Sequence, residues 1–419
     1  LKGFNPEVEG LNEIINIKKD DIRKVYELIN KSERPVVLLG HGVVASKKGD
    51  KLHSLLDEFK MPVLSTWRAK GIYGDDEELF MGYPGIPAAR YSNYILQNSD
   101  FLLIIGTRLN PAITAYSEET FAPKATKIIV DIDSNEIEKL DINFEIKINE
   151  DAGTFIDLLI ENKDLYLNRS RSEWVDYCIN IKNKYPLTNE IQPLNNEEKV
   201  DGYKFADALS NYMNSEDIYI GSSSGRTCGI SHMAINIKRG QKFISSMGIG
   251  SMGWCLPSAI ASCIASGKKR TIIFEGDGSL QHNIQELALI KTYDLPLKLF
   301  ILSNDGYASI YAMQLNNFNS NYAGCDRESG LDYPSIKSIA AAYDLEYHII
   351  NNEDEISDVL EKTMKDNRPI ICEVKTSINF DEIPKSKTIV NEDGSFSSSK
   401  LEYLYPFINE DEHEDNMIN

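Results

Sequence analysis

The sequence has few of the features that mark membrane, secreted or nucleic-acid-binding proteins. No apolar run approaches the roughly 20 residues that a transmembrane helix needs, and no charged, apolar and small-residue leader opens the chain. The 44 Lys and Arg residues face 64 Asp and Glu residues, and the resulting formal charge of −20 repels phosphate backbones. We therefore expect neither a membrane nor a nucleic acid among the partners.

The six cysteines and six histidines show no metal or disulfide pattern. No two cysteines are spaced as C-x-x-C, no histidines form H-E-x-x-H, and several cysteines lie in apolar stretches. The cysteines are Cys178, Cys228, Cys255, Cys263, Cys325 and Cys372. This usage favours a reduced, cytoplasmic protein over a disulfide framework or a zinc site.

The chain of 419 residues is too long for a single compact core, so two or three domains are expected. Apolar runs alternate with segments of helical periodicity, a pattern typical of parallel sheets. The first half should contain strands at 34–40, 61–66, 101–106, 126–133 and 144–148, with helices at 49–60 and 89–100. We assign residues 1–185, which include an entry segment and a connecting helix, to a first doubly wound α/β domain.

The second half repeats this alternation after a break. Residues 186–202 contain two prolines, many amides and no periodicity, which predicts a domain linker. Strands are expected at 217–221, 270–276, 297–304 and 368–375, with helices at 203–213, from 257, at 282–293 and at 333–344. Residues 203–385 thus form a second doubly wound parallel-sheet domain. The polar tail, 386–419, is expected to have a solvated, partly disordered acidic tip.

Two polar turns close neighbouring strands of the second domain. The turn GDGS (276–279) follows one strand, and the turn NDG (304–306) follows the next. Because parallel strands end at the same sheet edge, Asp277 and Asn304 should meet there. Their side-chain oxygens, together with a carbonyl just beyond Asn304, suit Mg²⁺ or Ca²⁺. The glycines allow close approach of an anion, so the paired turns predict a metal-bridged diphosphate.

These turns, 27 positions apart, resemble the thiamine diphosphate motif of the pyruvate-decarboxylase-like and acetolactate-synthase-like enzymes. The resemblance implies that Asp277, Asn304 and the carbonyl of Gly306 hold Mg²⁺. It also implies that Gly276, Gly278, Ser279 and Asn304 contact the cofactor. The family usually has Asn-Asn in the second turn, and this chain has Ser303-Asn304, which keeps the ligand position.

A glycine-rich stretch, SSMGIGSMGWCLPSAIAS (245–262), extends the resemblance. It implies that Met252 wedges the bound cofactor into its bent shape and that the carbonyl of Gly250 binds the exocyclic nitrogen of the aminopyrimidine. These two residues are therefore the catalytic candidates, although the stretch alone would indicate a loop before a core helix. Ser222 and Ser223, in IGSSSGRTCG (220–229), occupy the position that contacts the diphosphate, and ordinary loop serines are an equal alternative.

The first domain resembles the central domain of the same family. The segments GDDEELFMGYPG, NSDFLLIIGTRL and FAPKATKIIVDIDSNEIEK occur in the expected order. Some relatives bind FAD or ADP in this domain, and acetolactate synthases with FAD typically carry Asp-Asp-Arg after a G-x-R turn. Here Gly106-Thr107-Arg108 is followed by Leu-Asn-Pro-Ala. The sequence therefore argues against FAD and favours a structural spacer.

The glutamate that this family places on the aminopyrimidine ring belongs to a separate N-terminal domain, and we find no substitute for it here. Glu286 follows the diphosphate turn and would lie at the wrong end of the cofactor. Because the chain starts at Leu1 in a loop-like stretch, we expect a removed N-terminal segment or, as the less favoured alternative, a separate pyrimidine-domain chain. The chain alone is then expected to be inactive, and the family implies a homodimer or homotetramer.

The resemblance implies cleavage of a 2-oxo acid with loss of CO₂, followed by attack on a second carbonyl, as in acetolactate synthase. The segment 304–335 lacks the Trp of those enzymes and is similar to relatives associated with surface-sugar biosynthesis. A 2-oxo acid decarboxylase or aldehyde lyase remains an alternative, as does a non-catalytic cofactor-binding or structural subunit. His282 and Gln314 are candidates for facing the substrate, with a core or surface role favoured for both.

Overall fold

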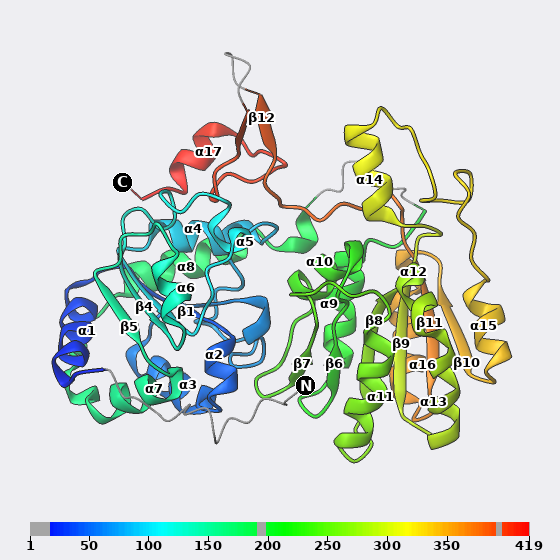
Figure 1. Cartoon of the computed structure of the whole chain (residues 1–419), viewed down its shortest axis with the longest axis horizontal. Coiled ribbons are helices and arrows are strands. Elements are labelled where there is room, and N and C mark those ends of the chain that lie inside the picture. The colour runs from blue at the N-terminus through cyan, green and yellow to red at the C-terminus, as the bar shows by residue number, and fades with distance from the viewer. Residues whose placement is uncertain (1–16, 191–197, 391–395, 419) are drawn as a thin grey trace, which may run out of the picture.

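The computed structural model describes residues 17–190, 198–390 and 396–418, and shows two α/β domains side by side (Figure 1). Each domain is built on one parallel sheet, of five strands in the first and six in the second. The predicted fold class of two doubly wound parallel-sheet domains is therefore confirmed. Part of the predicted linker, 191–197, lies outside the described residues.

The first sheet has the strand order β2-β1-β3-β4-β5. Its strands are β1 (Pro35–Leu39), β2 (Val63–Ser65), β3 (Phe101–Ile105), β4 (Thr126–Asp131) and β5 (Ile146–Asn149). The helices are α1 (Lys19–Lys31), α2 (His41–Ala45), α3 (Gly49–Phe59), α4 (Arg90–Asn98), α5 (Pro111–Thr114), α6 (Ser134–Glu138), α7 (Ala152–Glu161) and α8 (Ser172–Lys184), with 3₁₀ turns at Trp67–Ala69, Lys163–Leu165 and Leu187–Asn189. Helices α1, α3 and α7 pack on one face and α4, α6 and α8 on the other. Burial on both faces explains why β1 and β3 are continuous apolar runs.

The second sheet has the order β10-β11-β9-β8-β6-β7. Its strands are β6 (Ile218–Ile220), β7 (Lys242–Ile244), β8 (Thr271–Gly276), β9 (Leu297–Ser303), β10 (Glu346–Ile350) and β11 (Ile370–Lys375). The helices are α9 (Gly202–Tyr212), α10 (Gly225–Met233), α11 (Cys255–Ala265), α12 (Asp277–Leu280), α13 (Leu287–Tyr293), α14 (Ala308–Asn317), α15 (Ile336–Ala342) and α16 (Ile356–Lys365), with 3₁₀ turns at Gln281–Glu286 and Glu353–Glu355. Helices α9, α10 and α16 cover one face, and α11, α13 and α15 the other. None of the helices in the described part of the chain has the length and apolar character that a membrane span requires.

The helix after the first turn differs from the prediction. One continuous helix was expected over 282–293, but the chain becomes helical at Asp277, passes through a 3₁₀ turn and resumes as α13 at Leu287. Asn283 has non-helical backbone angles, and its side-chain amide donates to the carbonyl of Gly253 (2.8 Å). This contact with the glycine-rich loop explains the break.

The acidic tip was expected to be solvated and partly disordered; its acidic side chains are mostly exposed, but the segment folds as a helix. Residues 386–418 contain a hairpin of β12 (Thr388–Val390) and β13 (Phe396–Ser398) and a helix, α17 (Glu410–Asp415), that lies over the central domain (Figure 1). Arg90 of α4 donates to the carbonyl oxygens of Leu404 (2.7 Å) and Pro406 (2.5 Å). Asn98 donates to the carbonyl of Asn416 (2.9 Å). Such contacts tie the segment down, as the otherwise polar sequence did not suggest.

A loop of the first domain that includes Lys70 and Asp75 contacts the second domain. The Asp75 carboxylate accepts from the Tyr83 hydroxyl (2.8 Å) and from the amide of Ile237 in the second domain (2.7 Å). Lys70 lies 3.5 Å from the same carboxylate and donates to the carbonyl of Ile235 (2.9 Å). Burial lowers the pKa of Lys70 to about 8, and Asp75 opposes this shift. These bonds fix the first domain beside the start of β7.

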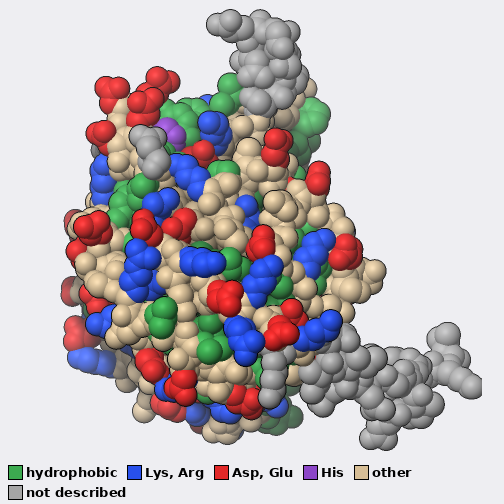
Figure 2. All heavy atoms as spheres, turned by 90° about the vertical axis from the view of Figure 1, so that its left-hand side faces the viewer, with side chains coloured by type: hydrophobic (Ala, Val, Ile, Leu, Met, Phe, Trp, Pro, Cys, Tyr) green, Lys and Arg blue, Asp and Glu red, His purple; other side chains and the backbone are tan. Residues whose placement is uncertain are grey.

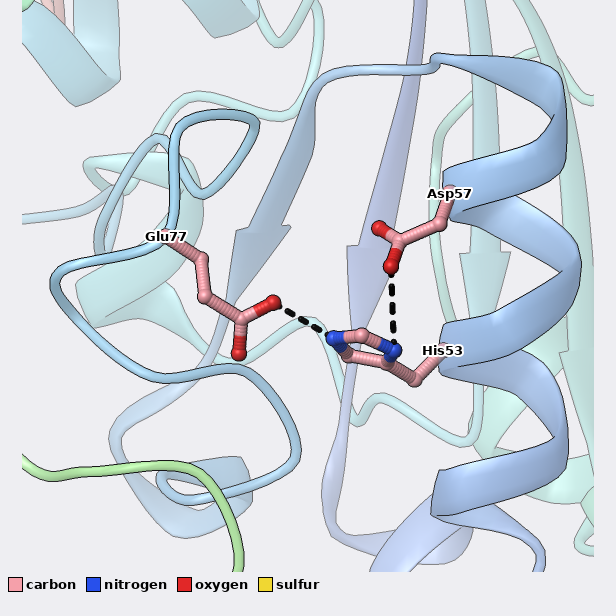
Figure 3. Close-up of side chains that lie close together, drawn as sticks. All are labelled: His53, Asp57 and Glu77. Carbon is pink, nitrogen blue, oxygen red and sulfur yellow. Dashed lines mark hydrogen bonds and ion pairs between the residues drawn. The ribbon is translucent and has the colours of Figure 1, made fainter.

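The imidazole of His53 holds the other end of this loop (Figure 3). Its Nε2 lies 2.5 Å from Glu77, and its Nδ1 lies 3.3 Å from Asp57, one turn further along α3. Glu77 also accepts from the amide of Gly74 (2.8 Å). His53, Asp57 and Glu77 therefore fasten this loop to α3.

The outer face of the central domain mixes basic and acidic side chains (Figure 2). Exposed ion pairs of this domain include Lys24–Glu145 (2.9 Å), Lys163–Glu58 (2.9 Å) and Arg169–Glu33 (3.1 Å). Exposed pairs of this kind contribute at most about 1 kcal/mol each to stability. The face in this view thus shows interspersed charge, with no extended region of one sign.

Candidate functional site

The two turns singled out in the sequence meet at the carboxyl ends of β8 and β9, which are paired neighbours. The Asp277 carboxylate accepts hydrogen bonds from three backbone amides: Oδ1 from Gly278 (2.8 Å), and Oδ2 from Asn304 (3.0 Å) and Asp305 (2.8 Å). One carboxylate therefore joins both turns. The expectation that they share one sheet edge is confirmed.

The Asp277 side chain is almost completely buried, with 4% of the residue exposed. Burial raises its pKa to about 7, and the three amide donors oppose the shift. None of the ion pairs among the described residues involves Asp277, although Lys375 lies 3.6 Å from the neighbouring Asp305. A buried carboxylate without a nearby cationic side chain is a suitable ligand for a metal ion.

The second turn is tight enough to need its own residue types. Asp305 has φ of +60°, and the amide of Gly306 donates to Oδ1 of Asn304 (3.2 Å). A Cβ at Gly306 would lie 2.4 Å from the carbonyl oxygen of Cys325. The structure thus places Asn304 and Gly306 beside Asp277, as predicted, and holds the turn with a side-chain hydrogen bond.

Glycine is also required in the first turn. A Cβ at Gly278 would lie 2.5 Å from the Tyr307 ring and 2.8 Å from the Tyr333 hydroxyl. A Cβ at Gly276 would lie 3.1 Å from the hydroxyl of Thr227 on α10. The absence of side chains at these two positions therefore lets the aromatic rings and the Thr227 hydroxyl pack directly against the turn, and glycine backbone of this kind also suits a bulky anion such as a diphosphate.

Ser279 makes a hydrogen bond within the protein, and its contact with the cofactor stays a prediction. Its hydroxyl accepts from the amide of Gly253 (2.9 Å), so it connects the first turn to the glycine-rich loop 245–253. Gly250 and Gly253 have φ of +71° and +73°, which other residues rarely adopt. Met252 is partly buried in the same loop. Gly250 lies near the turn of residues 222–224, called the serine turn below. A Cβ built on Gly250 would lie 3.8 Å from the carbonyl oxygen of Ser223.

Ser222 and Ser223 are both buried, and their polar groups bond within the domain. The Ser222 hydroxyl donates to the carbonyl of Ser224 in the same loop (3.2 Å). The Ser223 hydroxyl accepts from the amide of Ser246 (3.2 Å). Ser223 therefore links the serine turn to the glycine-rich loop. Contact with a diphosphate stays a prediction for both.

His232 connects helix α10 to the glycine-rich loop, and the sequence did not single it out. Its Nδ1 donates to the carbonyl of Cys228 (2.7 Å), and its Nε2 accepts from the hydroxyl of Ser245 (2.8 Å). Burial lowers the pKa of His232 to about 3, so the ring is neutral and can donate at one nitrogen and accept at the other. Arg68 of the first domain also donates to the Ser245 carbonyl. The glycine-rich loop is thus held from both domains.

Glu275, directly before the first turn, is the second residue that the sequence did not single out. It is 1% exposed, and neither carboxylate oxygen has a hydrogen-bond partner among the described residues. Burial raises its pKa to about 7, while the neighbouring Ser279 and Cys255 oppose the shift. An acidic residue at the penultimate position of a buried strand was the available signal.

The two substrate candidates lie in different surroundings. His282 packs beside the glycine-rich loop, where a Cβ at Gly253 would lie 2.6 Å from its own Cβ. Gln314 exchanges two hydrogen bonds with the backbone of Ala323 (2.9 and 3.2 Å), which holds the end of α14 to the following segment. The contacts of Gln314 match the structural role that was favoured for it.

The first domain has a cavity of about 800 Å³ at the equivalent sheet edge. It lies at the carboxyl ends of β1, β3 and β4, and Gly42, Gly106, Arg108 and Ile132 are among its lining residues. Trp67 of the first domain and Met247 of the second domain's glycine-rich loop also line it. Open α/β sheets usually bind ligands at this edge. The sequence favoured a purely structural role for the first domain, and the cavity gives that domain room for a ligand.

Two family models match the chain. The model described as "Thiamine pyrophosphate enzyme, central domain" matches residues 22–159, and that described as "Thiamine pyrophosphate enzyme, C-terminal TPP binding domain" matches residues 223–374. Together they cover well over half of the 419 residues. The second match contains both turns and the glycine-rich loop.

Curated relatives have the same character. The chain is 27% identical over 380 residues to the acetolactate synthase large subunit of Porphyra purpurea, covering 89% of this chain and 62% of the relative. It is 29% identical over 382 residues to a probable acetolactate synthase large subunit of Methanocaldococcus jannaschii, covering 89% and 61%. For the isozyme 1 large subunit of Escherichia coli, the identity is 26% over 359 residues, covering 85% and 61%. The chain thus spans about three fifths of the length of these relatives.

Proposed function

Because the chain belongs to the thiamine pyrophosphate enzyme family, we propose that it supplies the metal- and diphosphate-binding half of the active site of an acetolactate-synthase-like carboligase. The observation that carries this proposal is the buried Asp277 carboxylate, which accepts amide hydrogen bonds from both turns. Its position brings a metal ligand and two anion-accommodating turns to one sheet edge.

Three groups of this chain would hold Mg²⁺: the Asp277 carboxylate, Oδ1 of Asn304 and the carbonyl of Gly306. The cost of burying the Asp277 charge without a cation is visible in its raised pKa, and a bound divalent ion would remove that cost. Gly276, Gly278 and the amide-rich start of α12 would lie against the diphosphate. Asn304 would release its bond to Gly306, or share it, when it binds the ion.

The remaining residues of the site position the reacting end of the cofactor. The glycine-rich loop carries Gly250 and Met252, and the bonds of His232, Ser223 and Ser279 fix this loop to three other elements. Bound thiamine diphosphate supplies a carbanion that adds to a 2-oxo acid and an electron sink for its decarboxylation. The protein's part is to orient the cofactor and to exclude water from it.

The substrates and partners follow from the family and stay proposals. A 2-oxo acid is the proposed donor and a second carbonyl compound the acceptor. The segment 304–335 supports a place among the relatives associated with surface-sugar biosynthesis. The glutamate for the aminopyrimidine would come from a pyrimidine-binding segment outside the described residues or from another chain, in a cytoplasmic homodimer or homotetramer.

Calorimetric titration with thiamine diphosphate in Mg²⁺ tests the cofactor assignment, and product analysis with pyruvate tests the reaction. The chain should bind the cofactor only when Mg²⁺ is present. With the pyrimidine-binding segment supplied, acetolactate is the expected product. Acetaldehyde alone would instead identify a decarboxylase, and cofactor binding with no turnover in the complete assembly would identify a non-catalytic subunit.

A further inference from the structure

The segment 318–335, between α14 and α15, is anchored directly to the second turn. The amide of Tyr307 donates to the carbonyl of Cys325 (2.8 Å), and Gly306 forms an isolated antiparallel bridge with Asp326. Ser329 and Asp326 then exchange hydrogen bonds that close a turn within the segment. These backbone contacts therefore fix the segment 318–335 to the turn that carries the proposed metal ligands.

These anchors place the Tyr333 hydroxyl over the first turn. A Cβ built on Gly278 would lie 2.8 Å from this oxygen. The Tyr333 ring packs edge-to-face on Tyr307, with ring centroids 6.0 Å apart, so its direction is set by packing. The hydroxyl consequently faces the backbone of the residue that follows Asp277.

The Tyr333 hydroxyl is buried and has no hydrogen-bond partner among the described residues. Buried hydroxyl groups are nearly always paired, because an unpaired one loses its bonds to water without replacement. Burial, the neighbouring Asp277 carboxylate and the adjacent Tyr307 raise the pKa of Tyr333, so the group keeps its proton and remains a donor. The missing partner must be an acceptor that enters at the first turn.

We propose that the Tyr333 hydroxyl donates a hydrogen bond to a phosphate oxygen of the diphosphate held at the Asp277 turn. This inference rests on the proposed function, since it assumes that a diphosphate occupies that turn. It assigns a specific binding role to the segment that differs from the acetolactate synthases in lacking a Trp. The required ligand chemistry is an anionic oxygen acceptor, and the thiamine part of the cofactor is not involved.

The test is a Tyr333→Phe variant of the full chain, titrated in Mg²⁺ with three probes: thiamine diphosphate, inorganic pyrophosphate and thiamine. The variant should bind the first two about tenfold more weakly, because one bond to a charged acceptor is lost. Thiamine binding should not change. The thermal midpoint without ligand should stay equal or rise, because the buried unpaired hydroxyl is gone.

Tyr307→Phe and Tyr322→Phe are the matched controls, since one removes the adjacent hydroxyl and the other a distant hydroxyl of the same segment. Neither should reproduce the selective loss. Wild-type affinity of Tyr333→Phe for both phosphate probes would overturn the inference while leaving the proposed function intact. An equal loss for thiamine, or the same loss in Tyr307→Phe, would also overturn it. Failure of the wild-type chain to bind any phosphate probe would instead remove the proposed function.

Discussion

The two sheets of this protein have the same kind of edge but present different chemistry there. In both, the chain winds outward in one direction and then returns to the other side of its first strand, β1 in one domain and β6 in the other. Ligands of open parallel sheets bind beyond the carboxyl ends of strands at this switch point. In the second domain the switch point carries a buried carboxylate, and in the first it carries a cavity of about 800 Å³.

The acidic residues at the two edges show why the topology alone does not decide the chemistry. Asp277 is buried, and its carboxylate is held by amides from two turns. At the first edge, Asp133 is exposed and caps its own helix, accepting from the amide of Asn135 (2.9 Å), and Glu136 pairs with Arg108 (3.0 Å). The first edge therefore already satisfies its charges within the protein, whereas Asp277 has no cationic partner.

Removing the buried carboxylate should erase this difference and produce the largest effect. Asp277→Ala and the closer match Asp277→Asn should both abolish Mg²⁺-dependent binding of thiamine diphosphate, because each removes the anionic metal ligand. Isothermal titration calorimetry measures this. Asp133→Asn at the other edge is the matched control and should retain wild-type affinity. Undiminished binding by Asp277→Asn would refute the metal assignment.

Neutralising the second buried acid of this edge should stabilise the chain. Glu275→Gln should have a higher free energy of unfolding than the wild type above pH 7 and little difference below pH 4.5. The reason is that a raised folded-state pKa, about 7 here, makes the wild type lose stability as pH rises from 4.5 through 7, because the folded state binds the extra proton. The gain is bounded at about 3 kcal/mol.

Urea unfolding at pH 5 and pH 8, without metal, measures this gain. A variant that is destabilised at pH 8 would mean that the Glu275 carboxylate has a partner that stabilises its charge. Asp131→Asn at the first edge offers a comparison, since burial also raises the pKa of Asp131, while the amide of Asp133 donates to its carboxylate (3.0 Å). We expect a smaller gain there.

Breaking the contact between helix α10 and the glycine-rich loop should have an intermediate effect. His232→Leu removes both hydrogen bonds and leaves the carbonyl of Cys228 and the hydroxyl of Ser245 without them, so it should cost about 2 kcal/mol of stability. Ser245→Ala removes the bond to His232 and the bond that the hydroxyl accepts from the amide of Met247 (3.2 Å), so it should cost a similar amount. Both variants should bind thiamine diphosphate more weakly, with inorganic pyrophosphate affected less. Equal losses of affinity for both ligands would instead mean that His232 supports binding of the metal and diphosphate rather than of the thiamine part.

The parts of the fold that were predictable are those with strong local patterns. The interior strands β8 and β9 are mostly apolar because helices cover both faces, and each is followed by a turn of distinctive residues. The sequence did not predict β7 (Lys242–Ile244) or β10 (Glu346–Ile350). Both lie at the edges of the sheet and are partly exposed, so neither needs a continuous apolar run.

The site follows the same rule. The meeting of Asp277 and Asn304 was predictable because each closes its own strand and neighbouring parallel strands end together. The role of His232 depends on Ser245, 13 positions away, and that of Tyr333 depends on its ring contact with Tyr307. Local sequence patterns do not indicate such contacts. The docking of α17 was missed for the same reason, since its partners on α4 lie about 320 positions earlier in the chain.

The smallest expected effect tests whether the first edge takes part in cofactor binding at all. Arg108→Ala changes the lining of the 800 Å³ cavity and removes the exposed pair with Glu136, yet it should leave the affinity for thiamine diphosphate unchanged. Exposed pairs contribute little, and the first edge lacks a buried carboxylate that requires a cation.

The purified chain should also show no flavin absorbance near 450 nm after incubation with FAD and desalting. Retained flavin would show that the apolar cavity, rather than the missing Asp-Asp-Arg pattern, decides what this edge binds, and the two edges would then both be ligand sites of different chemistry.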